Sequence, residues 1–331
     1  LNLNAMAMLP RYNGGWLAHR LAAAEHGERI ALAQEQVALQ NTCRQARLAY
    51  FEVSQARSEV AAAEQELQSR QQLLKVVQDR RHSGRVARYV LVRAEAEVAA
   101  NQQALNSARA SFQSREGRLK FSLGLSWESR FDYSESGQPP PPPEDLAKSL
   151  ELARAQRPDL VATRLAVEEG DEKLLASLAE FSPRLSLVAM AESMHSSAMP
   201  WKPGFSVGLS VSFPLFDGGQ RSALAEVAQA EVGLRQSALT RLELQVEEEV
   251  TSARAGLVEA LDNSLLAEIE QARACEEWRI AKMRFELGRG LYLEMLDSLA
   301  LCARARSNRL KSLFEAQRRQ ADYLYATGRF P

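Results

Sequence analysis

The feature that most constrains this chain is where its prolines are absent. No proline occurs between Pro10 and Pro139, or between Pro214 and Pro331. A proline inside a helix costs about 3 kcal/mol, because it removes a hydrogen bond and clashes with the preceding turn. Ala, Glu, Gln, Arg and Leu dominate the sequence, which is the composition of long helices. The two proline-free spans therefore permit helices of unusual length.

The sequences of the two spans share the same pattern of glycines and prolines. When the chain is shifted by 204 positions, five Gly or Pro positions coincide without a gap. These pairs are Pro10 with Pro214, Gly14 with Gly218, Gly15 with Gly219, Gly84 with Gly288 and Gly124 with Gly328. Gly and Pro together are 17 + 12 = 29 of 331 residues, so chance does not explain five pairs in one register. Self-similarity at a fixed spacing indicates a duplication.

Each copy contains two helical runs separated by a glycine turn. The first run, 16–82, and its counterpart, 220–287, would each extend roughly 100 Å at the 1.5 Å rise of an α-helix. Helices of this length pack as antiparallel coiled-coil hairpins, with Gly84 and Gly288 at the hairpin tips. The expected buried stripe of the second copy has steps of three and four residues. It comprises Leu242, Val246, Val250, Ala253, Leu257, Leu261 and Leu265.

The chain divides into a first repeat (1–124), a linker region (125–157) and a second repeat (158–331). Five consecutive prolines at 139–143 predict an extended, exposed segment. A short helix after it is expected to stop near Arg157, since the residue before a proline disfavours helix. A second helix is expected over 159–181.

Short alternating segments precede the long runs. Residues 205–213, FSVGLSVSF, place Phe, Val and Leu on one side and Ser and Gly on the other, which is the period of a β-strand. Residues 185–192 are a less regular partner strand, and 193–204 would be the loop between them. Residues 1–9 correspond to 205–213 under the shift. Strands of about 9–11 residues suit a lipid-facing barrel; a small soluble sheet capping a coiled coil is the alternative.

Composition excludes several classes of function. The net charge is −1, which gives no reason to expect nucleic acid as a partner. No apolar run approaches the ~20 residues of a membrane-spanning helix. We find no catalytic constellation, phosphate-binding glycine loop or zinc spacing, so we expect no enzyme, no cofactor and no metal site. Met190, Met194, His195 and Met199 suggest a soft-metal site, an interpretation that we set aside.

Two of the three cysteines stand at similar distances from a hairpin tip. Cys275 lies 13 residues before Gly288, and Cys302 lies 14 residues after it. Antiparallel helices around this turn would bring both to the same height. Either a disulfide or two inert core residues fits this spacing, and the odd cysteine count favours the second interpretation.

The ordered segments resemble the TolC-like outer-membrane efflux proteins (outer membrane factors) over essentially the whole chain. The resemblance rests on QRPDLVATRLAVEEGDEKLLASLAEF at 156–181, followed by FSPRLSL, then SVGLSVSFPLFDGGQRSALAEVAQAE at 206–231 and RFELGRGLYLEMLDSLALCARA at 284–305. It implies a mainly α fold with a small β part. Duplicated helical hairpins would form a periplasmic tunnel, and the strands would join a shared barrel of a homotrimer in the outer membrane.

The resemblance also implies a function and partners. The function is a passive exit duct of a tripartite efflux or type I secretion system. Its partners would be a periplasmic adaptor protein, an inner-membrane pump and outer-membrane lipid. The residues left two alternatives: a periplasmic adaptor, which usually has one hairpin between lipoyl-like domains, and a soluble coiled-coil scaffold. The counterpart of 145–204 does not precede Leu1, so we expect the chain to be truncated at its N-terminus.

The implied functional residues cluster at the hairpin ends. Glu294 and Asp297 match the family's acidic positions at the periplasmic aperture, where three copies would form a ring of six carboxylates. Phe285 and Arg93 are added to the aperture set, since Arg93 corresponds to Asp297 under the shift and could pair with either acid. The tips, implied as the adaptor contact, are Gly84, Arg85, Gly288 and Arg289. Gly290, where the family often has a basic residue, and Val90, where it has an acidic one, depart from the pattern.

The two strand-to-helix junctions have similar sequences. FPLFDGGQ at 213–220 has LPRYNGGW at 9–16 as its counterpart. Proline ends strand pairing because it has no N–H, and the two glycines allow a tight bend. Asp217 would cap the following helix, with Asn13 in the same place in the first repeat. The junction residues are Pro10, Gly14, Gly15, Pro214, Gly218 and Gly219.

Overall fold

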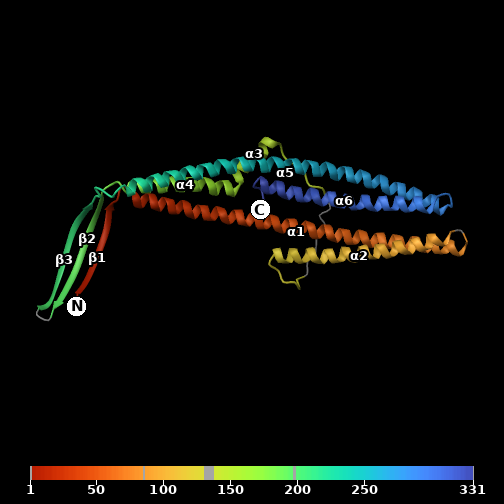
Figure 1. Ribbon diagram of the computed structural model, residues 1–331, viewed down its shortest axis with the longest axis horizontal. Helices are drawn as coiled ribbons and strands as arrows, with labels where there is room; N and C mark the ends of the chain where they lie inside the picture. Colours follow the sequence, from red (N-terminus) through yellow and green to blue (C-terminus); the bar gives the residue numbers. More distant parts are fainter. Residues whose placement is uncertain (1, 85, 130–137, 197–198, 331) are drawn as a thin grey trace. The chain divides into compact units, whose positions relative to one another are not determined.

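The computed structural model describes residues 2–84, 86–129, 138–196 and 199–330. The chain packs into two compact units. Unit 1 contains Leu1–Val37 and Pro158–Gln245, and unit 2 contains Ala38–Arg157 and Val246–Pro331. Figure 1 gives the order of the elements along the chain.

The long helices of the two repeats have equal lengths. Helix α1 (Trp16–His82) and helix α5 (Gln220–Glu286) each have 67 residues. Helix α2 (Arg88–Ser122) and helix α6 (Tyr292–Ala326) each have 35 residues. The shift of 204 holds at both starts, since 16 + 204 = 220 and 88 + 204 = 292. The predicted mainly helical fold with two long hairpins is confirmed.

The glycines that bend the chain follow the same shift. Among the described residues, eight glycines have positive φ, a conformation that costs L-residues roughly 1–2 kcal/mol. They form four pairs separated by 204 positions: Gly14 with Gly218, Gly15 with Gly219, Gly84 with Gly288 and Gly124 with Gly328. The first two pairs precede the long helices and the last two pairs follow helix ends. The backbone therefore bends in the same places in both copies.

The core of unit 2 is a coiled-coil seam with a strict heptad spacing on α5. Buried or half-buried positions alternate four and three residues apart between Val246 and Phe285. They are Val246, Val250, Ala253, Leu257, Ala260, Ser264, Ala267, Gln271, Ala274, Trp278, Ala281 and Phe285. The predicted stripe was wrong at Leu265, which is 60 % exposed, whereas Leu261 is half-buried beside the seam residue Ala260. The predicted stripe takes two successive steps of four residues after Leu257. It therefore leaves the seam, whose positions are 3.5 residues apart on average.

Helix α3 (Leu146–Gln156) belongs to unit 2 and ends before Pro158, as predicted. The preceding prolines are only partly exposed, since Pro140 is buried. The segment is tied to α6: Gln317 donates to the Gln138 carbonyl at 3.2 Å, and the Glu144 N–H donates to the Tyr323 hydroxyl at 3.2 Å. Extended backbone has no internal hydrogen bonds, so it takes partners from the helix beside it.

In unit 1, helix α4 (Pro158–Ala179) is held to both long helices. His19 of α1 lies 2.8 Å from Glu172, and His26 lies 3.3 Å from Glu168. Arg235 of α5 contacts Glu169 at 2.6 Å. Pro158 opens α4, a position where its missing N–H has no helical partner to lose. Helix α4 thus takes the role of second leg beside the early turns of α1 and α5.

Unit 1 also contains an antiparallel sheet of three strands in the order β1-β2-β3. The strands are β1 (Asn2–Tyr12), β2 (Arg184–Ser196) and β3 (Met199–Ser212). The predicted loop over 193–204 was wrong, since pairing continues from Ser193–Pro203 to Ser196–Met199. Prolines are tolerated in β3 because it is the edge strand of the sheet as described. The side chains of Met194, His195 and Met199, weighed as metal ligands, lie outside the described residues.

Both faces of β3 are uncovered. On β3 Phe205, Val207, Leu209 and Val211 alternate with Ser206, Gly208 and Ser210, and all are exposed. The apolar members are between 57 % and 77 % exposed. Across the described chain, no helix combines the length and apolar character needed to cross a membrane.

Candidate functional site at the hairpin ends

Both hairpins turn at a glycine beyond the end of the long helix. At the second turn the Arg289 N–H donates to the Arg284 carbonyl at 2.9 Å, and the Gly288 N–H donates to the Phe285 carbonyl at 2.9 Å. This pair of bonds closes the last helical turn in a Schellman motif, which requires a left-handed residue. Gly84 turns the first hairpin in the same conformation, with φ 71° against 74° for Gly288. Arg85 lies outside the described residues, and Arg289 is exposed.

Arg80 joins the two hairpins near these turns. Its guanidinium lies 4.2 Å from the centroid of the Phe285 ring and donates to the Glu286 carbonyl oxygen at 2.8 Å. Phe285 is 4 % exposed, and its ring lies 5.7 Å from that of Tyr292. A cation over an aromatic face is attracted by the ring quadrupole, more strongly where water is excluded. The end of α1 is therefore attached to the end of α5.

Tyr292 sits against the core of the first hairpin. It packs on a cluster of Val77, Val90 and Ala94. Burial raises the pKa of the Tyr292 hydroxyl, and Glu97 raises it further against the opposing effect of Arg70 and Arg93. Val90, at the position where the resemblance implies an acid, is 5 % exposed. A charge there would be desolvated in an apolar cluster, which explains why a valine fits.

A buried arginine lies deeper in the first hairpin. The Arg70 side chain is 7 % exposed and contacts Glu66 at 2.9 Å and Glu97, on α2, at 3.4 Å. Buried arginines need such carboxylate partners, because an unpaired buried charge is very costly. This ionic cluster ties α1 to α2 below the turn.

The predicted aperture acids are exposed on the first turns of α6. Glu294 and Asp297 are both exposed, and so is Arg93. Within the described part of this single chain, no ion pair joins Arg93 to either acid. Glu294 lies in the first turn of α6, where a carboxylate is favoured by the helix dipole. The structure thus brings Phe285 into the hairpin contact and leaves the two acids free to face solvent.

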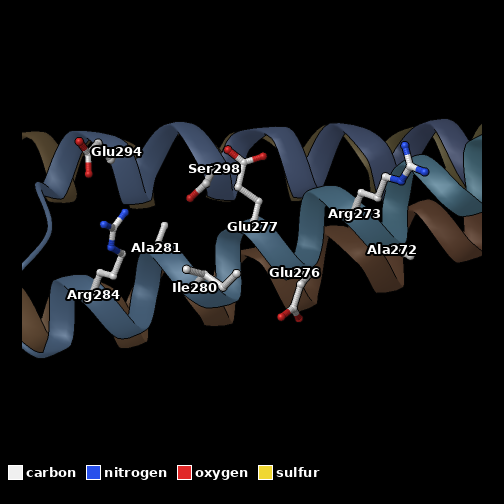
Figure 2. A pocket seen from close by; sticks show the side chains of 9 residues that line it. All are labelled: Ala272, Arg273, Glu276, Glu277, Ile280, Ala281, Arg284, Glu294 and Ser298. Carbon is white, nitrogen blue, oxygen red and sulfur yellow. The ribbon is translucent and has the colours of Figure 1, made fainter.

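A groove runs between α5 and α6 near the second turn (Figure 2). It has a volume of about 740 Å³ and carries Ile280, Ala272 and Ala281 beside charged groups. The charged members are Arg273, Glu276, Glu277, Arg284 and Glu294, and Ser298 completes the lining. A hydrogen bond from Arg279 lowers the pKa of Glu276, so this carboxylate stays ionised. The groove therefore offers a small apolar floor with charges of both signs around it.

A disulfide crosses the second hairpin at the base of this groove. Cys275 of α5 and Cys302 of α6 are bonded, with their Cα atoms 4.6 Å apart. The spacing left open whether these thiols pair, and the interpretation as two inert core residues was wrong. Both stand at the α5–α6 contact, where antiparallel legs approach closely enough for a disulfide. Cys43 is the free cysteine of the described chain.

The second strand-to-helix junction is organised by Asp217. Its carboxylate accepts from the Gly219 N–H at 3.1 Å and from the Arg221 N–H at 3.2 Å, so the predicted cap is confirmed. The Arg221 side chain donates to Asp217 at 2.6 Å and to the Pro214 carbonyl at 2.9 Å. The hydrogen bond from Arg221 is the main reason that the pKa of Asp217 is lowered.

The first junction works differently. Asn13 accepts from the Trp16 N–H at 3.1 Å through its backbone carbonyl, and the described contacts include no capping bond from its side chain. The predicted side-chain cap at Asn13 is therefore wrong. Gly14 is fixed by packing, because a Cβ there would lie 2.3 Å from the Ser182 Cβ. Close approach of two segments thus takes the place of the aspartate cap.

Comparison with known proteins decides the family. Residues 2–125 and 149–326 match the family described as "Outer membrane efflux protein". The chain belongs to the outer membrane efflux protein family. Within the family, it is 25 % identical over 248 residues to the outer membrane efflux protein BepC of Brucella suis biovar 1 (strain 1330). That alignment covers 73 % of this chain and 53 % of BepC, so the chain spans about half the length of this curated relative.

Solved structures of outer membrane channels share the fold. The chain superposes on CusC with a TM-score of 0.86 at 17 % identity, covering 99 % of this chain and 77 % of CusC. For VceC of Vibrio cholerae the TM-score is 0.80 at 16 % identity, with 99 % and 86 % covered. For MtrE of Neisseria gonorrhoeae, described in its open state, it is 0.80 at 18 % identity, with 99 % and 80 % covered.

Family membership settles location and excludes one alternative. This efflux protein is a protein of the bacterial outer membrane, with its helical part in the periplasm. It is not a periplasmic adaptor, and its family is one of efflux channels rather than enzymes.

Sequence reasoning missed three contacts at the hairpin ends. Neither Arg80 nor Tyr292 was given a role, and the Arg70 cluster was not foreseen. The available signal was the difference between copies, since Arg70 corresponds to Ala274 under the shift.

Proposed function

We propose that this chain forms part of the wall of a passive exit duct from the periplasm to the exterior. The duct would serve a tripartite efflux or type I secretion system. Three copies would assemble, with their strands in one shared barrel and their hairpins in one tunnel. No step of this function requires a catalytic group, a cofactor or a metal.

The proposal rests on one observation. The same chain has a strand with both faces uncovered and two long helical hairpins. The β3 face with Phe205, Val207, Leu209 and Val211 is exposed although it is apolar. Its opposite face carries serines and glycines and is also exposed. A sheet with one apolar and one polar uncovered face suits a wall between lipid and water. The family to which the chain belongs supports the same role.

We place the regulated aperture at the hairpin ends. The Arg80–Phe285 contact would hold the two tips of one copy together, and transport would require the tips to move. Glu294 and Asp297 would line the entrance and favour cations, because rings of carboxylates attract them. Arg93 would reach an acid of a neighbouring copy, since the ion pairs among the described residues of its own chain do not include it. The exposed turns at Gly84 and Gly288, with Arg85 and Arg289, would meet the adaptor.

The groove between α5 and α6 is the proposed contact for the adaptor protein. The groove presents small apolar residues beside charges of both signs, and an amphipathic helix of the adaptor would pack along it. The adaptor would link the duct to an inner-membrane pump, which supplies the energy. Outer-membrane lipid would cover the apolar strand face, and no nucleic acid is involved.

The test is electrical. The complete protein, purified in detergent, is inserted into a planar lipid bilayer, and single-channel current is recorded. We expect discrete, cation-favouring conductance steps, and restored export in a strain that lacks its own exit duct. A protein that assembles and inserts yet conducts no ions, and restores no export, would overturn the proposal. A soluble scaffold would remain in the aqueous phase.

A further inference from the structure

The Cys275–Cys302 disulfide closes a covalent loop around the end of the second hairpin. The bond joins α5 to α6 across a sequence separation of 27 residues, and the turn at Gly288 lies between its two ends. Cys302 is 1 % exposed, and Cys275 is half-buried. The bond therefore lies at the α5–α6 contact, with Cys302 inside the hairpin and Cys275 partly open to solvent.

This loop contains most of the groove described above. Of the nine residues that line the groove, seven lie between the two cysteines, and only Ala272 and Arg273 lie outside. Those inside are Glu276, Glu277, Ile280, Ala281, Arg284, Glu294 and Ser298. Figure 2 shows them projecting from both legs of the hairpin. The shape of the groove therefore depends on how firmly the two legs are held together here.

Among the described residues, the ion pairs inside the loop do not join its two legs. The pairs Arg279–Glu276 and Lys282–Glu286 each lie within α5, at 2.7 Å and 3.9 Å. Phe285, Met295 and Leu299 of this segment are buried, and Arg80 of the first hairpin contacts Phe285 and Glu286. Helix ends with few buried contacts open locally more often than helix centres. A covalent link at the base of this segment limits such opening.

The first hairpin is held in another way at the same height. Under the shift of 204, Cys275 corresponds to Gln71 and Cys302 to Val98. The legs there are tied by the buried Arg70 and its partners Glu66 and Glu97. The two hairpins of one chain thus use different chemistry for the same task, and only that of the second depends on oxidation.

We propose that the Cys275–Cys302 pair is a redox-sensitive staple that keeps the groove at the end of the second hairpin in its binding shape. The proposal rests on the proposed adaptor contact, because it concerns the regulation of that groove. In the oxidised chain the groove is pre-organised, so a partner helix loses less ordering free energy on binding. In the reduced chain the segment 276–301 opens more often and binds the partner more weakly.

The chemistry of closure is thiol–disulfide exchange. One cysteine thiolate attacks the disulfide of a protein dithiol–disulfide oxidant and forms a mixed disulfide. The second cysteine thiolate then attacks the chain's own sulfur of that mixed disulfide. The Cys275–Cys302 bond forms, the oxidant leaves as its dithiol, and the two thiols of this chain lose two protons and two electrons. The oxidising periplasm supports this direction.

Hydrogen exchange followed by mass spectrometry tests the proposal on the complete protein in detergent. Exchange is compared for the oxidised protein, for the protein reduced with dithiothreitol and for Cys275→Ala/Cys302→Ala. We expect amide exchange within 276–301 to accelerate on the order of a hundredfold in both altered forms, the size expected for opening a loop of this length. The reduced wild-type protein keeps the test valid if the double variant folds poorly.

Two controls accompany the test. Peptides from 72–97, the matching segment of the first hairpin, should keep their exchange rates. Cys43→Ser should behave as the wild-type protein. Free thiols at both 275 and 302 in the oxidised protein would overturn the proposal. So would unchanged exchange within 276–301, or an equal acceleration in 72–97. The measurement needs no bilayer and no adaptor, so its failure is distinct from a failure to find conductance.

Discussion

The guanidinium of Arg80, on the first hairpin, lies 4.2 Å from the ring centroid of Phe285, on the second. This contact links two segments that are more than two hundred positions apart in the sequence. It combines a cation–π interaction with a hydrogen bond to the Glu286 carbonyl, so one side chain makes both connections. A substitution of Arg80 consequently tests the attachment between the two hairpin ends.

We expect Arg80→Ala to loosen the hairpin ends with little loss of global stability. Cation–π contacts contribute about 0.5–2 kcal/mol, a small part of the stability of a large helical protein. In bilayer recordings the variant should show a larger or more frequently open conductance. Arg81→Ala is the matched control, because Arg81 is an exposed neighbour on the same turn. Equal conductance of the two variants would contradict a closing role for Arg80.

Substitution by alanine should destabilise the protein less at Gly288 than at Gly328, although both glycines have the same backbone conformation. Gly288 has open space around it, whereas a Cβ on Gly328 would lie 2.9 Å from the Arg157 backbone nitrogen. Both substitutions place a side chain at positive φ, at a cost of roughly 1–2 kcal/mol. Gly328→Ala adds a backbone clash worth about 1–3 kcal/mol. Thermal unfolding in detergent should therefore give a distinctly lower Tm for Gly328→Ala, and equal Tm values would refute this packing argument.

The Asp217 cap should stabilise the junction in a pH-dependent way. Because the hydrogen bond from Arg221 lowers the pKa of Asp217, the folded state favours the ionised carboxylate. Its contribution is fully present above the ordinary aspartate pKa and is lost as the pH falls through the lowered value. Asp217→Asn should thus destabilise the protein at neutral pH and have no effect in strong acid. Asp262→Asn, an exposed aspartate on the same helix, should show no such difference when unfolding is measured across this range.

Neutralising the proposed aperture acids should change ion preference. Glu294→Gln with Asp297→Asn removes six carboxylates from a ring of three copies, so the reversal potential in a salt gradient should move toward zero. Glu270→Gln is the control, because it removes an exposed carboxylate from α5 at a distance from the turn. If the double variant keeps the cation preference of the wild-type protein, the acids do not line the entrance.

Much of the fold could be predicted because the length and the ends of a helix depend on nearby residues, chiefly proline and glycine. The absence of prolines and the repeated glycines predicted α1 and α5 almost to the residue. The seam on α5 was predicted less well, because several alanines and polar residues share it and hydropathy alone does not favour Ala260 over Leu261. Whether a leucine is buried there depends on the coiled-coil period, which a partner helix imposes.

The site was predicted in part, for a related reason. Gly288 and Phe285 could be found because a turn and a large apolar residue are visible in one segment. Arg80, Arg70 and the disulfide partners could not be assigned, since each depends on which distant leg lies opposite. Sequence spacing brought Cys275 and Cys302 to similar height, but only the helix packing decides whether their Cβ atoms face each other.

The legs of the second hairpin are joined by a disulfide, and those of the first by an ionic cluster. This difference has a consequence for any ring built from this chain. A ring of three copies would contain six hairpins of matched length, and a covalent bond would occur in every second one. Neighbouring hairpins around the circumference would then differ in stiffness although they share one backbone plan. Movement at such an opening would follow the threefold order of the chains, with compliant and stiff hairpins alternating.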